Sequence, residues 1–153
     1  MLAAHVPPLM ARGTANVVRP GGRLANWVTD RLRLPKAGLE LPVAISVRDV
    51  DGVLHWERTF GDSHLATTQT LEAGLMHETL GAHRITFRVT TSDGTAVYES
   101  VGSRWRGISI PSVLCPKACG VVSPNGDGWK VAIEVHAPLL GLICAYTATL
   151  ALE

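Results

Sequence analysis

The amino-acid sequence predicts a mainly β protein, an antiparallel β-barrel or strongly curved sheet of about ten short strands with one amphipathic helix covering it. Two features carry this prediction. Polar and apolar residues alternate with a period of two, so that Trp56, Arg58 and Phe60 share one face of a strand over 53–60. The runs are separated by Asp-Gly and Asn-Gly pairs, which supply the positive φ angles of tight hairpin turns, at 51–52, 93–94 and 125–128.

The strand pattern recurs along most of the chain. The predicted strands cover residues 14–19, 41–50, 53–60, 63–71, 74–80, 83–91, 95–106, 118–123, 129–136 and 142–151. Most of the intervening segments are too short for the crossover that a parallel pair requires, so we expect antiparallel neighbours. An open sheet of this size would expose two strand edges, and closure into a barrel removes them.

One segment departs from the period of two. In GGRLANWVTDRLRLPKAG, apolar residues recur at helical spacing, charged residues take the other side, and Pro35 ends the pattern. The segment predicts a helix over 22–34 with an apolar stripe of Leu24, Trp27, Val28 and Leu32. A helix on a membrane surface would show the same pattern, but burial of the stripe against the sheet also explains it, and burial is our expectation.

Composition bounds the domain count and the partners. A chain of 153 residues with 46% hydrophobic content suffices for a single domain over 1–153. The formal charge of +1 lacks the basic excess that nucleic-acid binding requires, and no window approaches the ~20 apolar residues of a membrane span. Three cysteines are an odd number, and Pro7-Pro8 breaks the apolar run where a secretion signal would lie, so we expect a cytoplasmic location.

Four stretches, in this order and spacing, resemble a bacterial family, domain of unknown function number 4166: GRLANWVTDRLRLPKAG, WERTFGDSHLATTQTLEAGLMHETLG, ISIPSVLCP and APLLGLICAYTATL. The resemblance spans nearly the whole chain. It places the family pattern on Trp56, Arg58, Phe60, Gly61, Thr67, Glu78, Gly81, Pro111, Pro116, Pro138, Gly141 and Tyr146. Family members often follow a saccharopine-dehydrogenase-like nucleotide-binding domain. This chain contains no Gly-x-Gly-x-x-Gly stretch, so we expect a stand-alone member, and the resemblance itself implies no activity.

Strand alternation indicates which polar residues face the interior. If the face with Arg58 points inward, the next strands present Thr67, Gln69 and Glu78 to the same interior, and they leave His55, Glu57, His64, His77 and Thr79 outside. A lone charge would be costly in an apolar barrel, so we expect Arg58 and Glu78 to form an ion pair. Such a pair is either structural or the polar anchor of a small-molecule pocket.

The spacing of His, Cys and Ser matches no common metal or nucleophile motif, so we expect no metal and no other cofactor. His77 and His83 lack the four-residue helical spacing of a zinc protease, and Cys115 and Cys119 lack the second pair of a structural zinc site. Cys144 lies in an apolar run, where a buried thiol is ordinary. No Gly-x-Ser-x-Gly stretch is present either.

These observations favour a small-molecule enzyme, a cofactor-independent cyclase or isomerase that folds an apolar substrate inside the barrel. The residues expected to polarise a carbonyl or move a proton are Arg58, Thr67, Glu78 and Tyr146. Those expected to shape the substrate are Trp56, Phe60, Met76, Phe87 and Trp129. Two alternatives stay open, a non-catalytic binding or carrier protein for an apolar small molecule and a filled barrel that serves as an interaction domain. A homodimer also stays open.

Overall fold

A computed structural model describes residues 9–153, and residues 1–8, with the Pro7-Pro8 pair, lie outside the described part. The described part contains one helix and eleven strands. Their bounds are β1 Leu9–Val18, α1 Arg23–Arg31, β2 Gly38–Val50, β3 Val53–Phe60, β4 Ser63–Glu72, β5 Leu75–Leu80, β6 His83–Ser92, β7 Thr95–Trp105, β8 Ile108–Ser109, β9 Lys117–Asn125, β10 Gly128–Ala137 and β11 Gly141–Leu152. No helix among residues 9–153 is long and apolar enough to cross a membrane.

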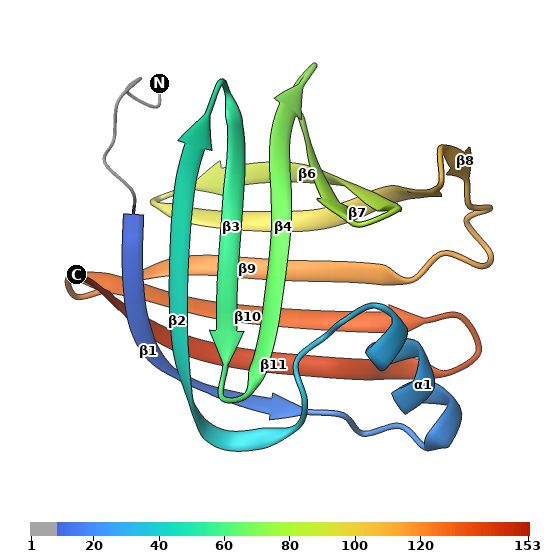
Figure 1. The fold of residues 1–153 in the computed structure, drawn as a ribbon, viewed down its shortest axis with the longest axis horizontal. Helices are drawn as coiled ribbons and strands as arrows, with labels where there is room; N and C mark the ends of the chain where they lie inside the picture. The colour runs from blue at the N-terminus through green and yellow to red at the C-terminus, as the bar shows by residue number, and fades with distance from the viewer. Residues whose placement is uncertain (1–8) are drawn as a thin grey trace.

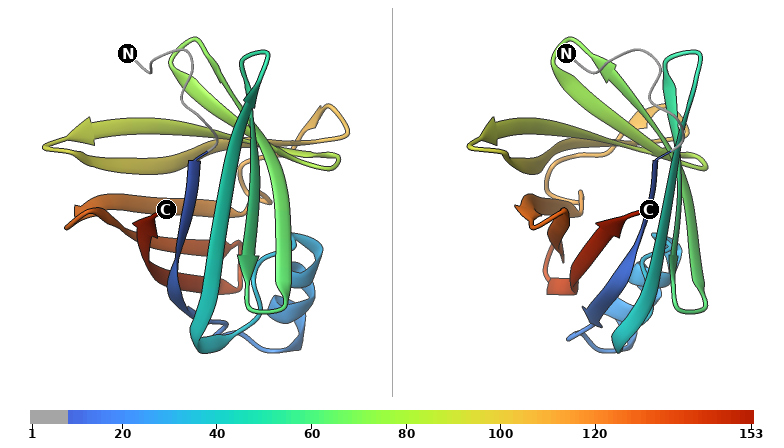
Figure 2. Two further views of the ribbon diagram at one scale, coloured as in Figure 1. Left: turned by 60° about the vertical axis from the view of Figure 1, so that its left-hand side comes forward. Right: turned by 90° about the vertical axis from the view of Figure 1, so that its left-hand side faces the viewer.

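Ten of the strands close into an antiparallel barrel, as the sequence predicts. The ladder runs β6-β5-β4-β3-β2-β1-β11-β10-β9-β7, and an additional pairing of β6 with β7 joins its two ends. The two-residue β8 is appended to the end of β7. Figure 1 shows β1 to β4 crossing in front of β6, β7 and β9 to β11, and the turned views of Figure 2 show these two groups of strands as opposite walls.

Two of the three predicted hairpin turns have the expected pair of positive φ angles, whereas in 125–128 only Gly126 has one. Asp51 and Gly52 both adopt positive φ angles, 52° and 83°, and Asp93 and Gly94 repeat this with 50° and 80°. Two consecutive positive φ angles are the signature of a type I′ turn, whose twist matches that of antiparallel strands. The predicted turn chemistry is therefore confirmed at both positions.

Some element bounds differ from the prediction. β1 begins at Leu9 instead of 14, because Gly13 belongs to the strand instead of preceding it. A Cβ atom at Gly13 would lie 1.7 Å from the carbonyl oxygen of Thr149, so only glycine allows β11 to approach this closely. β8 was not predicted, since two residues are too few to show alternation.

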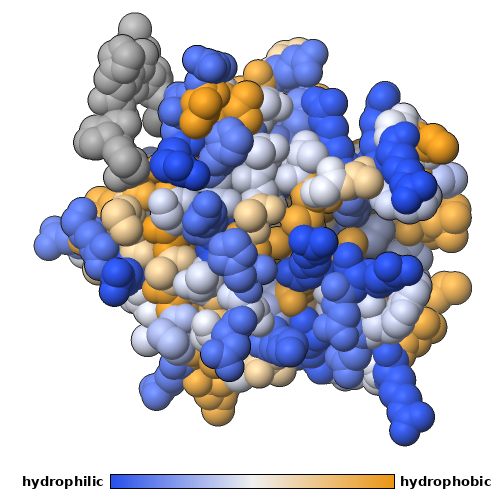
Figure 3. All heavy atoms as spheres, viewed as in Figure 1, coloured by the Kyte–Doolittle hydropathy of each residue, from blue (hydrophilic) through white to orange (hydrophobic). Residues whose placement is uncertain are grey.

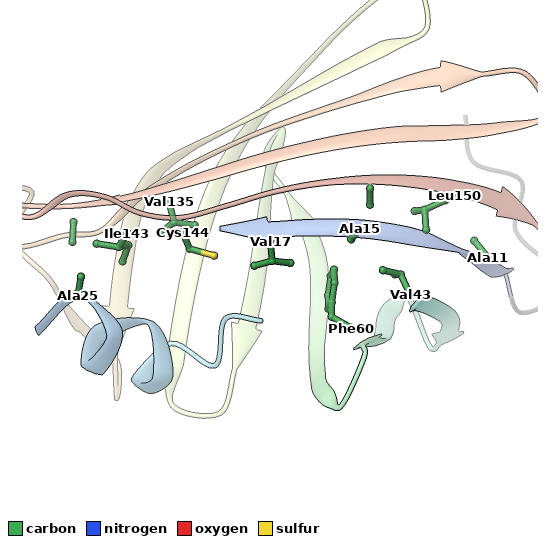
Figure 4. Close-up of a cluster of buried hydrophobic side chains, with 12 residues drawn as sticks. Ala11, Ala15, Val17, Ala25, Val43, Phe60, Val135, Ile143, Cys144 and Leu150 are labelled. Carbon is green, nitrogen blue, oxygen red and sulfur yellow. The ribbon is translucent and has the colours of Figure 1, made fainter. Parts of the chain in front are cut away.

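The main core lies between β1, β2, β10, β11 and the helix (Figure 4). Small and β-branched residues dominate it, and Ile143 and Cys144 are completely buried. Figure 4 shows Ala25 of α1 pointing toward Ile143, so the helix reaches the core through a small side chain. The core consists of Ala11, Ala15, Val17, Ala25, Val43, Phe60, Val135, Ala137, Ile143, Cys144, Ala148 and Leu150.

The predicted burial of the helix is wrong for two of its four stripe residues. Leu24 is 60% exposed and Trp27 is 58% exposed, whereas Val28 and Leu32 do pack against the core. The buried positions of the helix are Ala25 and Thr29, and the Thr29 hydroxyl donates a hydrogen bond to the carbonyl of Asn26. The helix therefore contacts the core through Ala25, Val28 and Leu32, and two large apolar side chains stay in solvent.

Candidate functional site

Three polar side chains from three neighbouring strands meet inside the barrel. Both terminal nitrogens of Arg58, Nη1 and Nη2, donate to Oε1 of Glu78 at 3.0 Å. Nη1 also donates to the Thr67 hydroxyl at 3.1 Å, and this hydroxyl donates to the same Glu78 oxygen at 2.7 Å. The side chains of Arg58 and Glu78 are only 13% and 19% exposed. The predicted ion pair is confirmed, and Thr67 completes what we call the Arg58 cluster.

Strand register explains why these residues meet. Trp56 of β3 lies opposite Thr67 of β4, and Gln69 of β4 lies opposite Glu78 of β5, so all three strands direct the same parity of positions inward. Arg58 has the parity of Trp56 and therefore joins the same face. The positions predicted to face outward fall on the opposite parity of these strands; they are His55, Glu57, His64, His77 and Thr79.

Two aromatic residues border the Arg58 cluster. The Arg58 guanidinium carbon lies 4.8 Å from the ring centre of Trp56, a cation–π contact. Phe60 meets Tyr146 of β11 edge to face, with ring centres 5.2 Å apart. The Trp56 indole nitrogen is the one buried side-chain polar atom without a hydrogen-bond partner among residues 9–153.

Tyr146 lies within electrostatic range of this ion pair. Burial raises the pKa of its phenol to about 12, the charge of Arg58 lowers it and that of Glu78 raises it. No side-chain hydrogen bond of the described part involves the Tyr146 hydroxyl. Tyr146 as a whole is half-buried. The phenol is therefore a neutral hydrogen-bond donor beside a charged pair.

Sequence reasoning missed two further groups of the interior. Burial, followed by the charge of Glu78, raises the pKa of Tyr98 on β7. His83 is paired with the buried Ser103 at 2.9 Å, and burial lowers the pKa of its imidazole. Strand alternation could have predicted an inward-facing His83, because His83 lies on the same face of β6 as Ile85 and Phe87. Tyr98 precedes a bulge in β7, where alternation fails.

The remaining predicted residues divide between two places. Met76 and Phe87 are directly opposite each other on β5 and β6, and Phe87 is buried. Trp129 on β10 packs against the main core and lies opposite Leu150. Within residues 9–153, no hydrogen bond or ring contact joins Trp129 to the Arg58 cluster.

Two hollows lie beside the strands of the barrel. One of about 270 Å³ is on the outer side of β2 to β5, and its outward-facing lining includes Arg48, His55 and Glu57. Trp56 and Thr67 also border this hollow, whereas Arg58 and Glu78 do not. A smaller hollow of about 90 Å³ separates β7 from the segment 110–117.

Cysteine and histidine form no metal centre in the described part. No group of three or more His, Cys, Asp or Glu side chains converges among residues 9–153. Cys115 and Cys144 are buried thiols and Cys119 is exposed. His77 and Glu78 occupy successive positions of a strand, so they point to opposite sides of the sheet.

The family described as domain of unknown function, DUF4166, matches residues 6–150, and no curated protein matches the chain. A crystal structure of a protein with unknown function from the DUF3598 family of Nostoc punctiforme PCC 73102 has a similar fold, with a TM-score of 0.59. The two are 11% identical over 94% of this chain and 46% of that one, so the chain spans about half the length of that protein. At this identity the likeness shows the fold alone.

Proposed function

The chain belongs to the DUF4166 family, whose description assigns no activity, and we propose that its barrel binds an apolar small molecule with a neutral polar group beside the Arg58 cluster. The observation that carries the proposal is the Tyr146 hydroxyl. Tyr146 is half-buried beside Phe60, no side-chain hydrogen bond among residues 9–153 involves its hydroxyl, and with a pKa raised to about 12 it is protonated at neutral pH. A few polar groups in an apolar enclosure are typical of small-molecule sites.

The ion pair decides the charge of the ligand. Glu78 already neutralises Arg58, so the cluster carries no net charge for a carboxylate or an ammonium group to meet. Oε1 of Glu78 accepts three of the four hydrogen bonds of the cluster, which leaves Oε2 as an acceptor. A ligand carbonyl would accept a hydrogen bond from Tyr146, and a ligand hydroxyl would donate one to Glu78.

Apolar walls supply the rest of the binding energy. Phe60 touches Tyr146, and Met76 and Phe87 face the same interior from β5 and β6. Trp56 covers the guanidinium of Arg58, and its buried indole nitrogen offers a further donor. The ligand that fits these groups is a mainly hydrocarbon molecule with a ketone or alcohol.

Fluorescence titration with Prodan, a neutral naphthalene ketone, tests this proposal. The probe should bind saturably with blue-shifted emission, and Tyr146→Phe should weaken binding up to about tenfold through loss of one hydrogen bond. Thr147→Val is the matched control, because Thr147 is the next residue on β11 and is exposed on the outer side. Absence of saturable binding would instead favour a filled barrel, and equal binding by Tyr146→Phe would place the probe elsewhere.

A second candidate is catalysis, as a cofactor-independent isomerase or cyclase. The observation that favours it is a neutral phenol next to a carboxylate. Tyr146 would donate a hydrogen bond to a carbonyl oxygen, Oε2 of Glu78 would accept a proton from the adjacent carbon and return it elsewhere, and Arg58 and Thr67 would hold Glu78 in place. Trp56, Phe60, Met76 and Phe87 would fold the substrate, with Trp129 further along the wall.

Such a reaction conserves the substrate's molecular formula. The probes are β,γ-unsaturated ketones with apolar chains, whose conversion to the conjugated isomer appears as new ultraviolet absorbance at unchanged mass. Turnover should disappear in Tyr146→Phe and Glu78→Gln and persist in Thr147→Val. Prodan binding without any isomerisation would reject the catalytic candidate and leave the binding proposal standing.

A further inference from the structure

Large apolar side chains are exposed in three segments at one end of the molecule. The segments are α1 with its flanking connections (19–36), the end of β7 with its connection to β9 (104–117), and the β10–β11 turn with the residues beside it (136–141). Figure 1 shows α1, β8 and the β10–β11 turn at the right-hand end of the longest axis. In Figure 3, hydrophobic and strongly hydrophilic spheres alternate along this edge. The exposed apolar residues are Leu24, Trp27, Trp105, Ile108, Val113, Leu114 and Leu139, each at least half exposed.

Positive charge gathers in the same segments. Residues 19–36, 104–117 and 136–141 hold eight of the 14 Lys and Arg of the chain and only one of its 13 Asp and Glu, Asp30. Arg19 binds this carboxylate at 2.8 Å and also donates to the carbonyls of Leu34 and Pro35. None of the other seven cations forms a salt bridge within residues 9–153; they are Arg23, Arg31, Arg33, Lys36, Arg104, Arg106 and Lys117.

Each exposed tryptophan at this end carries an arginine on its ring. The Arg31 guanidinium lies 5.4 Å from the ring centre of Trp27, and that of Arg106 lies 4.7 Å from the ring centre of Trp105. Tryptophan next to Arg or Lys is the combination enriched where proteins meet the headgroup layer of a bilayer, since the ring enters the interface and the cation meets phosphate.

We propose that this end, here called the basic end, docks on the surface of an anionic phospholipid bilayer. Unpaired cations would attract the anionic headgroups, and the apolar side chains would enter the boundary between headgroups and acyl chains. The seven apolar residues belong to three separate segments instead of one groove, and a deformable bilayer accommodates such separate projections without a matching surface. This inference does not depend on a ligand inside the barrel.

Charge distinguishes this occupant from the others. A second copy of the chain would bring the same seven cations against themselves, and like charges across an interface are unfavourable. A nucleic acid would satisfy the cations, but its phosphates would leave Ile108, Val113 and Leu114 in water. An anionic bilayer satisfies both the charge and the apolar side chains.

Vesicle co-sedimentation of the full chain tests the proposal. The protein should sediment with vesicles of equimolar phosphatidylcholine and phosphatidylserine and stay in solution with phosphatidylcholine alone. The double variant Arg31→Gln/Arg106→Gln should lower the partition coefficient roughly 25-fold, about fivefold for each charge. Trp27→Ala/Trp105→Ala should also weaken binding, and the tryptophan emission of the native protein should shift to the blue on binding.

Matched controls come from exposed residues elsewhere on the barrel. Arg88→Gln/Lys130→Gln removes two exposed cations outside the three segments, and Leu71→Ser removes an apolar side chain that is 68% exposed. Both variants should bind vesicles like the native protein. Three outcomes would overturn the proposal. They are equal losses of binding in the Arg31/Arg106 and Arg88/Lys130 variants, equal sedimentation with both vesicle types, and no sedimentation at all. If the protein binds a DNA duplex tightly and Trp27→Ala/Trp105→Ala does not weaken this binding, the partner of the basic end is nucleic acid. If the protein forms dimers and the same variant is monomeric, the partner is a second copy of the chain.

Discussion

Glu78→Gln removes the negative charge of the Arg58 cluster and keeps its shape. Removing one partner of a buried ion pair costs about 3–5 kcal/mol, because the other charge stays desolvated without its counter-charge. Gln retains an oxygen at the position that accepts three of the four hydrogen bonds of the cluster, and the guanidinium keeps its contact with Trp56. We therefore expect the lower end, a loss of about 3 kcal/mol in the free energy of unfolding, or a melting temperature lower by roughly 6–12 °C.

Urea unfolding followed by circular dichroism measures this loss, and Glu57→Gln provides the control. Glu57 lies one position before Arg58 on the outer face, and its contact with Arg48 is 3.7 Å long with both side chains more than half exposed. Such an exposed pair contributes less than about 1 kcal/mol. If Glu78→Gln destabilises the protein no more than Glu57→Gln, the Arg58 cluster is not a desolvated ion pair and the reasoning fails.

Two further predictions concern Tyr146 and Gly13. Because the pKa of Tyr146 is raised to about 12 in the folded state, the unfolded chain loses this proton first, so the contribution of Tyr146 to stability should be constant up to about pH 10 and be lost toward pH 12. Tyr146→Phe should remove that part of the alkaline fall in a series of urea midpoints. Gly13→Ala should destabilise the barrel by more than about 3 kcal/mol, since its Cβ would overlap the Thr149 backbone, whereas Gly102→Ala, which meets nothing within 4 Å, should change the urea midpoint little.

The double substitution Arg58→Met/Glu78→Leu connects stability with function. Replacing a buried ion pair with apolar residues of similar size often restores stability, because no charge is then left without a partner. If Prodan binding survives in this variant, the pair only organises the strands. If stability returns and binding is lost, the pair is the polar anchor of the site.

Local rules suffice for the barrel and for the Arg58 cluster. Register between neighbouring strands has a period of two, so one inward residue on β3 determines the inward residues of β4 and β5, and desolvation then requires Arg58 and Glu78 to pair. The approach of Tyr146 to this pair could not be derived in the same way. Tyr146 and Phe60 come from strands on different walls, and their contact depends on how the whole barrel closes.

The helix shows a different limit of sequence reasoning. Helical periodicity identifies a face, but the way the helix is rotated against the sheet decides which side chains are buried. Here Ala25 and Thr29 are buried and Val28 and Leu32 pack against the core, whereas Leu24 and Trp27 stay exposed. The hydrophobic pattern therefore predicts the helix and misplaces half of its buried stripe.

Net charge conceals the basic end for a related reason. The three segments carry a formal charge of +7, and the other residues carry −6, so the chain sums to +1. Exposed charges interact over a Debye length of about 8 Å at physiological ionic strength, which is shorter than a small protein domain. An approaching surface therefore meets the local charge of one end instead of the sum over the molecule. A near-neutral composition argues against an overall attraction to polyanions, and it places no limit on a cationic face that the fold assembles from segments far apart in the sequence.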